Sequence, residues 1–376
     1  MTKVNKLSIL SMMEAKDAFD LILKLPENDD NKMLSREDIE KREYEYLSPY
    51  AMKAAETMGR DAEEAKDDFR TEYQRDRNRI IHSKSFRRLM HKTQVFLAPE
   101  GDHFRTRLTH TLEVSQIART IARALALNED LTEAIAMGRD LGHTPFGHIG
   151  ESLLNQRHPG GFRHNEQSLW VVEKLEHAGY SEGCGMNLTK EVRDGILNHT
   201  GPDWPMTLEG QVVRHSDRIA YINHDIDDAI RGGVIRAEDL PKHCIDVLGA
   251  THSKRISTLV RDVVANSDGK DRVMLSDEKK KAMDELRAFM FEHVYLSPSV
   301  RADAGMEKVR AIIFGLYDYY SEHSEAMPKE RREMIDAYGI ETCVKDHIAS
   351  MSDRYAVRAY TELFIPKNWK TDIEGM

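Results

Sequence analysis

The stretch from Gly138 to Glu151 concentrates side chains that can hold a metal ion or transfer a proton. Asp140, His143, His148 and Glu151 fall within twelve positions, separated by glycines and a proline typical of a helix end and a tight loop. His148 and Glu151 stand three residues apart at the start of the next expected helix, where they can act as an acid–base couple. The spacing indicates hydrolytic chemistry.

A histidine and a second aspartate from elsewhere in the chain can complete a metal site with Asp140. His110 lies in the first turn of an expected helix, and Asp217 begins a stripe with Tyr221 and Asp225 along another. A solvated helix face would show the same acidic stripe, although Tyr221 and apolar neighbours favour an interior pocket. Imidazole and carboxylate ligands from three helices form an open site for Mn, Mg, Fe, Co or Zn. Such an ion turns water into a nucleophile near neutral pH.

Basic side chains near these candidates suit an anionic substrate. Arg107, Lys92 and Arg218, together with His143 and His164, can neutralise a polyphosphate. The residue types and spacings together predict a metal-assisted phosphohydrolase.

Helices must position these residues, because helical periodicity dominates the chain and alternating strands are scarce. We therefore expect an all-α fold. The helix over 108–127 is expected to place Leu112, Ile117, Ile121 and Leu125 on its apolar side, and two further helices are expected over 131–141 and 207–230. Ser35 to Asp38 offers a capping box for a charged helix that runs to Ser48-Pro49.

Three regions are expected along the chain. Residues 1–34 end in a polar linker and form an N-terminal extension, residues 35–235 carry nearly all the candidate site residues, and residues 236–376 form a C-terminal helical region packed on that core. No internal repeat or low-complexity tract interrupts them.

The composition narrows the class of protein. The 376 residues carry 54 basic and 64 acidic side chains, a formal net charge of -10, which argues against general affinity for DNA or membranes. Three widely spaced cysteines exclude a disulfide framework and indicate buried thiols in a reducing compartment. Lys3 and Lys6 precede an apolar stretch that acidic residues interrupt, so a short amphipathic helix is expected rather than a signal peptide. We expect a cytoplasmic protein without a membrane span.

A local cluster of arginines gives a weaker hypothesis of nucleic-acid binding. It comprises Arg75, Arg77, Arg79, Arg87 and Arg88. Such arginines more often pair with neighbouring acids or line a nucleotide site between subunits.

Longer motifs make the chain resemble the HD-domain superfamily, and within it the bacterial deoxynucleoside triphosphate triphosphohydrolases. The resemblance covers roughly residues 42–235 and excludes residues 1–34. It rests on EYLSPYA, QRDRNRIIHSKSFRRLMHKTQVF, GDHFRTRLTHTLEVSQIARTI, the stretch from Asp140 to Glu151, GGFRHNEQSL and DRIAYINHDIDD, with DHIASMSDRYA as a variant of a C-terminal motif. It implies an HD-domain helical core with additional N- and C-terminal helices.

The resemblance implies roles for individual residues. The metal ligands would be His110, Asp140 and Asp217, and the catalytic pair would be His148 and Glu151. Residues that contact the triphosphate or the sugar would be Arg107, His143, His164, Arg218 and Tyr221, with Gln94 and Asp225 near the deoxyribose.

The implied reaction releases a deoxynucleoside and inorganic triphosphate from a dNTP. The resemblance further implies a homo-oligomer, with a nucleotide effector bound at regulatory sites in some family members. The sequence leaves open which dNTP is preferred and which metal is native.

One residue departs from the family pattern, because Arg139 stands where the pattern has a histidine of a His-Asp pair. A guanidinium has no lone pair for a metal, and beside Asp140 it can occupy the metal position. A carboxylate in the last turn of a helix is expected to have a compensating cation, which could be a metal or Arg139 itself. Three explanations stay open: an introduced inactivating substitution, a natural pseudoenzyme that binds nucleotide, or replacement of the lost ligand by His82, His103 or His143.

Two other functions remain. The chain could be another HD phosphohydrolase, acting on nucleoside monophosphates or guanosine alarmones, although the matches GDHFRTRLTH and FRHNEQSL weigh against it. It could also be a catalytically inactive dNTP-binding regulator, for which Arg139 is the direct support.

Overall fold

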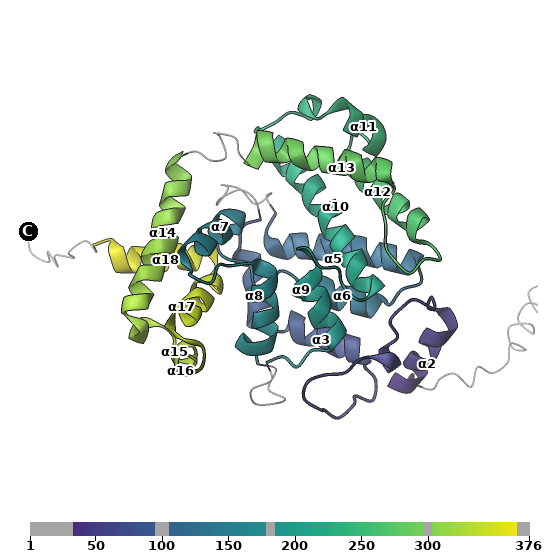
Figure 1. The fold of residues 1–376 in the computed structure, drawn as a ribbon, viewed down its shortest axis with the longest axis horizontal. Helices are drawn as coiled ribbons and strands as arrows, with labels where there is room; N and C mark the ends of the chain where they lie inside the picture. The colour runs from purple at the N-terminus through teal and green to yellow at the C-terminus, as the bar shows by residue number, and fades with distance from the viewer. Residues whose placement is uncertain (1–32, 95–104, 178–184, 296–302, 367–376) are drawn as a thin grey trace, which may run out of the picture.

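The computed structural model describes residues 33–94, 105–177, 185–295 and 303–366, and in these ranges the protein is all-α (Figure 1). The one pairing of extended backbone found there is an isolated bridge between Thr93 and Thr106. Across the same residues, every helix is too short or too polar to traverse a bilayer. The expected amphipathic helix near the N-terminus lies outside the described residues.

The candidate site residues are carried by a central group of helices. In this group α5 packs against α6 and α10, and α6 also packs against α3 and α9. The bounds of the group are α3 (Glu72–Ile81), α5 (Arg107–Ala124), α6 (Glu129–Gly138), α9 (Lys190–Asn198) and α10 (Leu208–Arg231).

The remaining elements surround this group, with α11 to α13 beside α10 and α14 to α18 on the other side of the molecule (Figure 1). The helices are α2 (Arg36–Tyr46), α4 (Lys84–Arg88), α7 (Gly147–Arg157), α8 (His164–Trp170), α11 (Lys242–Leu248), α12 (His252–Ser267), α13 (Asp277–Met290), α14 (Asp303–Glu322), α15 (Lys329–Arg332), α16 (Ile335–Tyr338), α17 (Ile340–Ala349) and α18 (Asp353–Phe364). Short turns are η1 (Ala54–Glu56), η2 (Leu89–His91), η3 (Val171–Leu175), η4 (Ala237–Asp239), η5 (Phe291–Tyr295) and η6 (Ser324–Ala326).

Side-chain caps explain where the key helices begin. Ser35 and Asp38 form the expected capping box at α2, which confirms that prediction. Thr106 accepts from the backbone N–H of Thr109 at the start of α5, and Thr207 caps α10 in the same way. The expected range 131–141 was displaced along the chain, because α6 begins at Glu129 and ends at Gly138.

One expected core residue of α5 is wrong. Leu112 is 48% exposed, whereas Ile117 and Ile121 are buried together with Val114 and Ala118. Leu112 lies five residues before Ile117, which places it roughly 140° around the helix axis from the buried face.

Two apolar clusters divide the interior. The larger one contains the buried faces of α3, α5, α6, α9 and α10 and continues into α11, α12 and α13. The smaller one joins Phe146 and the apolar face of α7 to α14, α17 and α18. The candidate site therefore has neighbours from both clusters. The division of the chain at residue 235 stays a prediction.

Cysteines and the arginine cluster behave as ordinary structural residues. Cys244 and Cys343 are buried free thiols, and Cys184 lies outside the described residues.

Arg75 and Arg79 pair with Glu64, and Arg77 pairs with Asp130 and Glu133. These acids offset the charge of three of the five arginines, whereas Arg87 and Arg88 donate to the carbonyl oxygens of His82 and Ser350.

A buried carboxylate should make the stability of the fold depend on pH. Glu209 Oε1 accepts from the backbone N–H groups of Met52 and Asn128, each at 3.0 Å, while burial raises the pKa of Glu209 from 4.5 to about 7. A raised folded-state pKa means that the unfolded chain loses its proton first. Stability is therefore fully present below pH 4.5 and falls as the pH rises to about 7, by roughly 3 kcal/mol.

We predict that Glu209→Gln removes this pH dependence, because the amide keeps one oxygen for both backbone donors but carries no charge. Its effect on the free energy of unfolding, measured in urea, should be more favourable at pH 8 than at pH 5 by up to ~3 kcal/mol. Any packing cost of the amide is equal at both pH values. The exposed Glu238→Gln is the control, and an equal effect of Glu209→Gln at both pH values would contradict the prediction.

Candidate active site

A cavity of about 730 Å³ opens where α5, α7, α8 and α10 meet. Its wall contains Gln94, Arg107, His110, Asp140, His143, His148, His164, Asp217, Arg218 and Tyr221, all of which were expected from the sequence. Glu151 lies within 4.0 Å of three of these histidines, His143, His148 and His164. Asp225 is buried and does not line the cavity.

Arg139 lies between the two aspartates that were expected to hold a metal. Its side chain is fully buried, its Nε donates to Asp217 Oδ1 at 2.9 Å, and its Nη2 lies 3.3 Å from Asp140 Oδ2. A third nitrogen, Nη1, donates to the carbonyl oxygen of Ala136 at 2.7 Å. Although burial opposes their charge, Arg139 holds the pKa of Asp140 and of Asp217 well below the usual range.

The geometry shows that a metal ion does not fit between the expected ligands in this chain. His110 Nε2 lies 3.2 Å from the same Asp217 oxygen that Arg139 binds. The guanidinium thus occupies the space in which an ion would contact His110, Asp140 and Asp217 together. Among the described residues, groups with ligand atoms close enough for one ion are Asp140 with His143 and His164, His110 with Glu113 and His224, and His243 with Cys244 and Glu285.

A series of hydrogen bonds fixes the protons on two histidines of the cavity. His199 Nδ1 lies 2.7 Å from the carbonyl oxygen of Ile196, so this nitrogen carries the proton and Nε2 accepts. His164 Nε2 lies 3.2 Å from that acceptor and therefore donates, while His164 Nδ1 lies 2.9 Å from Glu151 Oε1. Burial lowers the pKa of His164, but Glu151 outweighs it and raises that pKa overall, which favours the imidazolium. Burial lowers the pKa of His199 to about 4.

The expected pair of His148 and Glu151 is looser than the contact with His164. His148 Nδ1 lies 3.7 Å from Glu151 Oε2, and the His148 side chain is 64% exposed. Although burial opposes the charge of Glu151, His164 and His148 hold its pKa well below the usual range. Glu151 is therefore an ionised carboxylate between one buried and one exposed imidazole.

Arg107 supplies unused hydrogen-bond donors to the cavity. It is 2% exposed, and its nearest carboxylate oxygen, Oδ2 of Asp140, is 3.6 Å away. Its Nε and Nη2 have no hydrogen-bond partner within the described chain, and neither has Oε1 of the neighbouring Gln94. Buried groups of this kind cost about 1–3 kcal/mol each when unpaired, so the site is arranged for a polar ligand.

Several cavity residues were missed because no local pattern marks them. They are His199 from the end of α9, Arg214 from α10, Arg287 from α13, Phe291 from η5 and Arg310 from α14. The last three come from the C-terminal region, and only tertiary packing brings them to the cavity.

Other residues that were considered do not reach the cavity. Lys92 is 2% exposed, and its Nζ donates to the carbonyl oxygens of His143 and Ala349. It therefore joins the loop between α6 and α7 to the end of α17 and is not available to a ligand. His82 lines a different cavity, and His103 lies outside the described residues.

Close backbone contacts hold the loop between α6 and α7. The N–H of Gly142 donates to Ser168 Oγ, and a Cβ atom at Gly142 would come 2.2 Å from the backbone nitrogen of Ser168. α8 can therefore lie directly on the loop, and this contact allows His143 to stack on His164 with ring centroids 4.0 Å apart. Phe146 adopts a left-handed conformation with φ 65° just before α7.

We predict that Gly142→Ala destabilises the protein by about 1–3 kcal/mol, because α8 must move to admit the methyl group. Urea unfolding measures the change. Gly160→Ala is the matched control, since a Cβ atom there meets only the side chain of His158 at 3.1 Å. Equal stabilities of the two variants would contradict the close-packing argument.

Comparison with known proteins identifies the family of the chain. Residues 107–222 match the HD domain, and residues 273–362 match the phosphohydrolase-associated domain. Curated relatives named deoxyguanosinetriphosphate triphosphohydrolase-like protein match nearly the whole chain.

Three of these relatives span 98–99% of their own length in the match. The relative from Caldanaerobacter subterraneus subsp. tengcongensis is 59% identical over 90% of this chain. Those from Clostridium perfringens and Desulfatibacillum aliphaticivorans are 49% and 48% identical, each over 89% of it.

Proposed function

Because the chain belongs to the deoxyguanosinetriphosphate triphosphohydrolase-like family of HD-domain phosphohydrolases, we propose that its cavity binds a deoxynucleoside triphosphate. The proposed reaction is hydrolysis to a deoxynucleoside and inorganic triphosphate. The observation that carries the proposal is Arg107, a buried arginine with two unpartnered nitrogens in a cavity lined by further cations. Phosphate oxygens are the acceptors that a guanidinium fork fits best.

The proposed binding mode separates the phosphates from the nucleoside. Arg107 and the imidazolium of His164 hold the buried phosphate, and Arg218 neutralises the outer part of the chain. Tyr221 and Gln94 contact the deoxyribose and the base. Asp225 makes no direct contact in this proposal, because it does not line the cavity.

The proposed chemistry needs two proton transfers. Water attacks the α-phosphorus, the bond to the 5′ oxygen breaks, and that oxygen takes up a proton as the deoxynucleoside leaves. His148 is exposed to the cavity, accepts the proton that the attacking water loses and returns a proton to the 5′ oxygen, while Glu151 orients its ring. The hydrogen bonds from His164 keep Glu151 ionised throughout.

Arg139 stands in the way of the divalent metal that the family uses for turnover. HD domains bind such ions, but Arg139 fills the space between Asp140 and Asp217. We therefore route no step through a metal at that position. The proposal is a site that binds nucleotide fully but turns it over slowly while residue 139 is arginine.

A second candidate function is a dNTP-binding regulator without turnover, which the buried ion pairs of Arg139 favour. The two functions differ in one observable: slow release of triphosphate from dNTPs by the native chain. Release of phosphate from a nucleoside monophosphate or a guanosine alarmone would instead indicate another HD phosphohydrolase. The homo-oligomer, the nucleotide effector and the cytoplasmic location stay predictions.

We predict that Arg139→His raises manganese content and triphosphate release together. The substitution removes the guanidinium and supplies an imidazole beside Asp140. Elemental analysis and a triphosphate-release assay on mixed dNTPs measure the two quantities, and release should rise at least about 100-fold if a metal-activated nucleophile is restored.

The control is Arg139→His combined with Asp140→Asn, which should lose both gains. Unchanged release in Arg139→His with manganese present would contradict the role assigned to residue 139. It would leave dNTP binding as the function.

We also predict that Arg107→Ala weakens dNTP binding at least about tenfold, since a buried charge-assisted contact to phosphate is lost. Calorimetry with dATP and dGTP measures it on the native Arg139 background, where turnover is slow. Arg119→Ala, on the same helix and with a 40% exposed side chain, is the control. Equal affinities in the two variants would contradict the proposed binding mode.

A further inference from the structure

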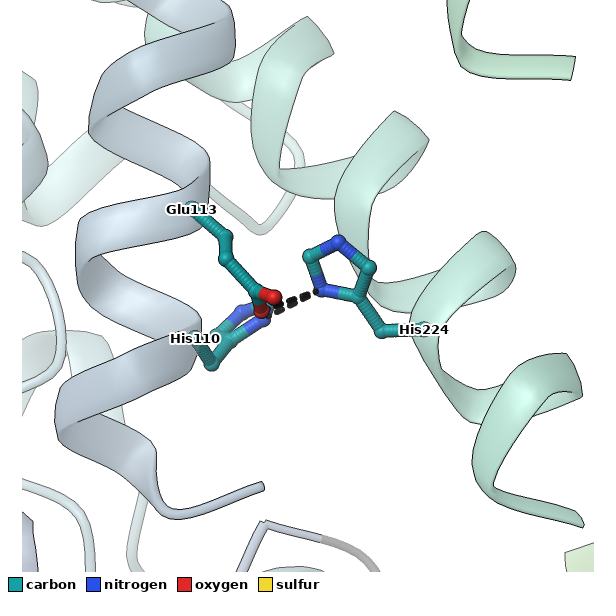
Figure 2. Close-up of side chains that lie close together, drawn as sticks. All are labelled: His110, Glu113 and His224. Carbon is teal, nitrogen blue, oxygen red and sulfur yellow. Dashed lines mark hydrogen bonds and ion pairs between the residues drawn. The ribbon is translucent and has the colours of Figure 1, made fainter. Parts of the chain in front are cut away.

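His110 presents its second ring nitrogen to side chains outside the cavity, between α5 and α10 (Figure 2). Its Nε2 faces Asp217, while its Nδ1 lies 3.4 Å from Nδ1 of His224. The two rings are perpendicular, with centroids 5.7 Å apart, and Figure 2 shows the Glu113 carboxylate beside both rings.

A carboxylate completes this group. Glu113 lies one helical turn after His110 on α5, and its Oε2 is 3.2 Å from His224 Nδ1. The three ligand atoms all lie within 4.8 Å of one another. In a tetrahedral zinc site with bonds of about 2.0–2.1 Å, neighbouring ligand atoms are about 3.3–3.4 Å apart. The distances from His224 Nδ1 to His110 Nδ1 and to Glu113 Oε2, 3.4 and 3.2 Å, are close to that spacing.

Protons alone satisfy this group poorly. Each neutral imidazole offers either one donor or one acceptor at Nδ1, and an ionised Glu113 offers only acceptors. A proton on His224 Nδ1 can serve His110 or Glu113, but a single N–H cannot point well at both. A cation between the three side chains contacts all three lone pairs.

The inner side of His110 supports the same assignment. A histidine that binds a metal through one nitrogen usually donates its other N–H to a carboxylate, which fixes the ring. With Nδ1 as the ligand, Nε2–H donates to Asp217 Oδ1 at 3.2 Å. Asp217 is itself held by Arg139 Nε at 2.9 Å. The arginine that blocks the inner position therefore stabilises the orientation needed for an outer one.

Charged side chains surround the group on its solvent side. Arg105 pairs with Glu113, Asp227 and Asp228, and Arg231 pairs with the same two aspartates. Arg255 adds a third positive charge close to Asp227, so three arginines face three carboxylates. The side chain of Glu113 is 36% exposed, so an ion can enter from solvent on that side.

We propose that His110, Glu113 and His224 bind one divalent transition-metal ion, with zinc as the best match to two imidazoles and one carboxylate. The fourth position belongs to water. The ion ties α5 to α10 beside the cavity. This site is independent of whether the cavity turns nucleotide over, because no dNTP contact depends on it.

Titration of the metal-stripped full-length chain with zinc chloride in calorimetry tests the proposal. We expect one tight site per chain in the native protein, weakened at least about tenfold by Glu113→Gln and by His224→Gln. Asp140→Asn removes a carboxylate of the inner position only and should leave the zinc affinity within about threefold. Cobalt added to the stripped native chain should give the visible absorption of a four-coordinate site, and Glu113→Gln should lose it.

Glu113→Gln changes a partly exposed side chain, so it keeps the test valid if His224→Gln fails to fold. Zinc affinity that falls in Asp140→Asn but not in Glu113→Gln would overturn the proposal and place the ion on the inner side of His110. A tight site lost only in His243→Ala would assign it to the His243 cluster instead. The absence of any tight zinc site would show that protons satisfy the group. Calorimetry with dATP, done in parallel, reports separately on the function proposed for the cavity.

Discussion

The buried charge of Arg139 organises the centre of this molecule. It joins the end of α6 to α10 through Asp217, lies against Asp140, and leaves His110 with only its outer nitrogen available. Removing one partner of such a buried pair typically costs about 3–5 kcal/mol, because the other charge stays desolvated. The ion pair thus decides both how the three helices meet and which chemistry the cavity can support.

Local sequence signals predicted much of the fold, because they depend on the backbone nearby. The capping box at Ser35 and the helices around His110 and Asp217 follow from side chains within a turn or two. The wrong prediction for Leu112 also came from a local signal, its apolar side chain. An apolar residue on α5 was assigned to the core, although its angle around the axis places it 48% exposed.

Cavity residues could be predicted where they fall in a recognisable motif, whichever segment carries it. His143 and His164 follow from local motifs, but His199 was missed, because it matters only through a contact with His164 made by packing. Arg287 and Arg310 belong to the C-terminal region and become cavity residues through tertiary contacts that no spacing encodes. Lys92 was expected to bind phosphate but does not reach the cavity. Its side chain is buried, and its Nζ donates to the backbone carbonyl oxygens of His143 and Ala349.

The packing of α7 has a consequence for how the protein is made. α7 carries His148 and Glu151, yet it packs on α14, which in turn packs on α17 and α18, and the N–H of Phe146 donates to Asp353. At about 5–20 residues per second, the ribosome needs roughly 10–40 s to pass from the end of α7 to the start of α17. During that interval the nascent chain exposes an apolar surface and has no assembled site. A chain truncated by stalling in that interval therefore exposes a surface that chaperones bind and lacks the site for nucleotides.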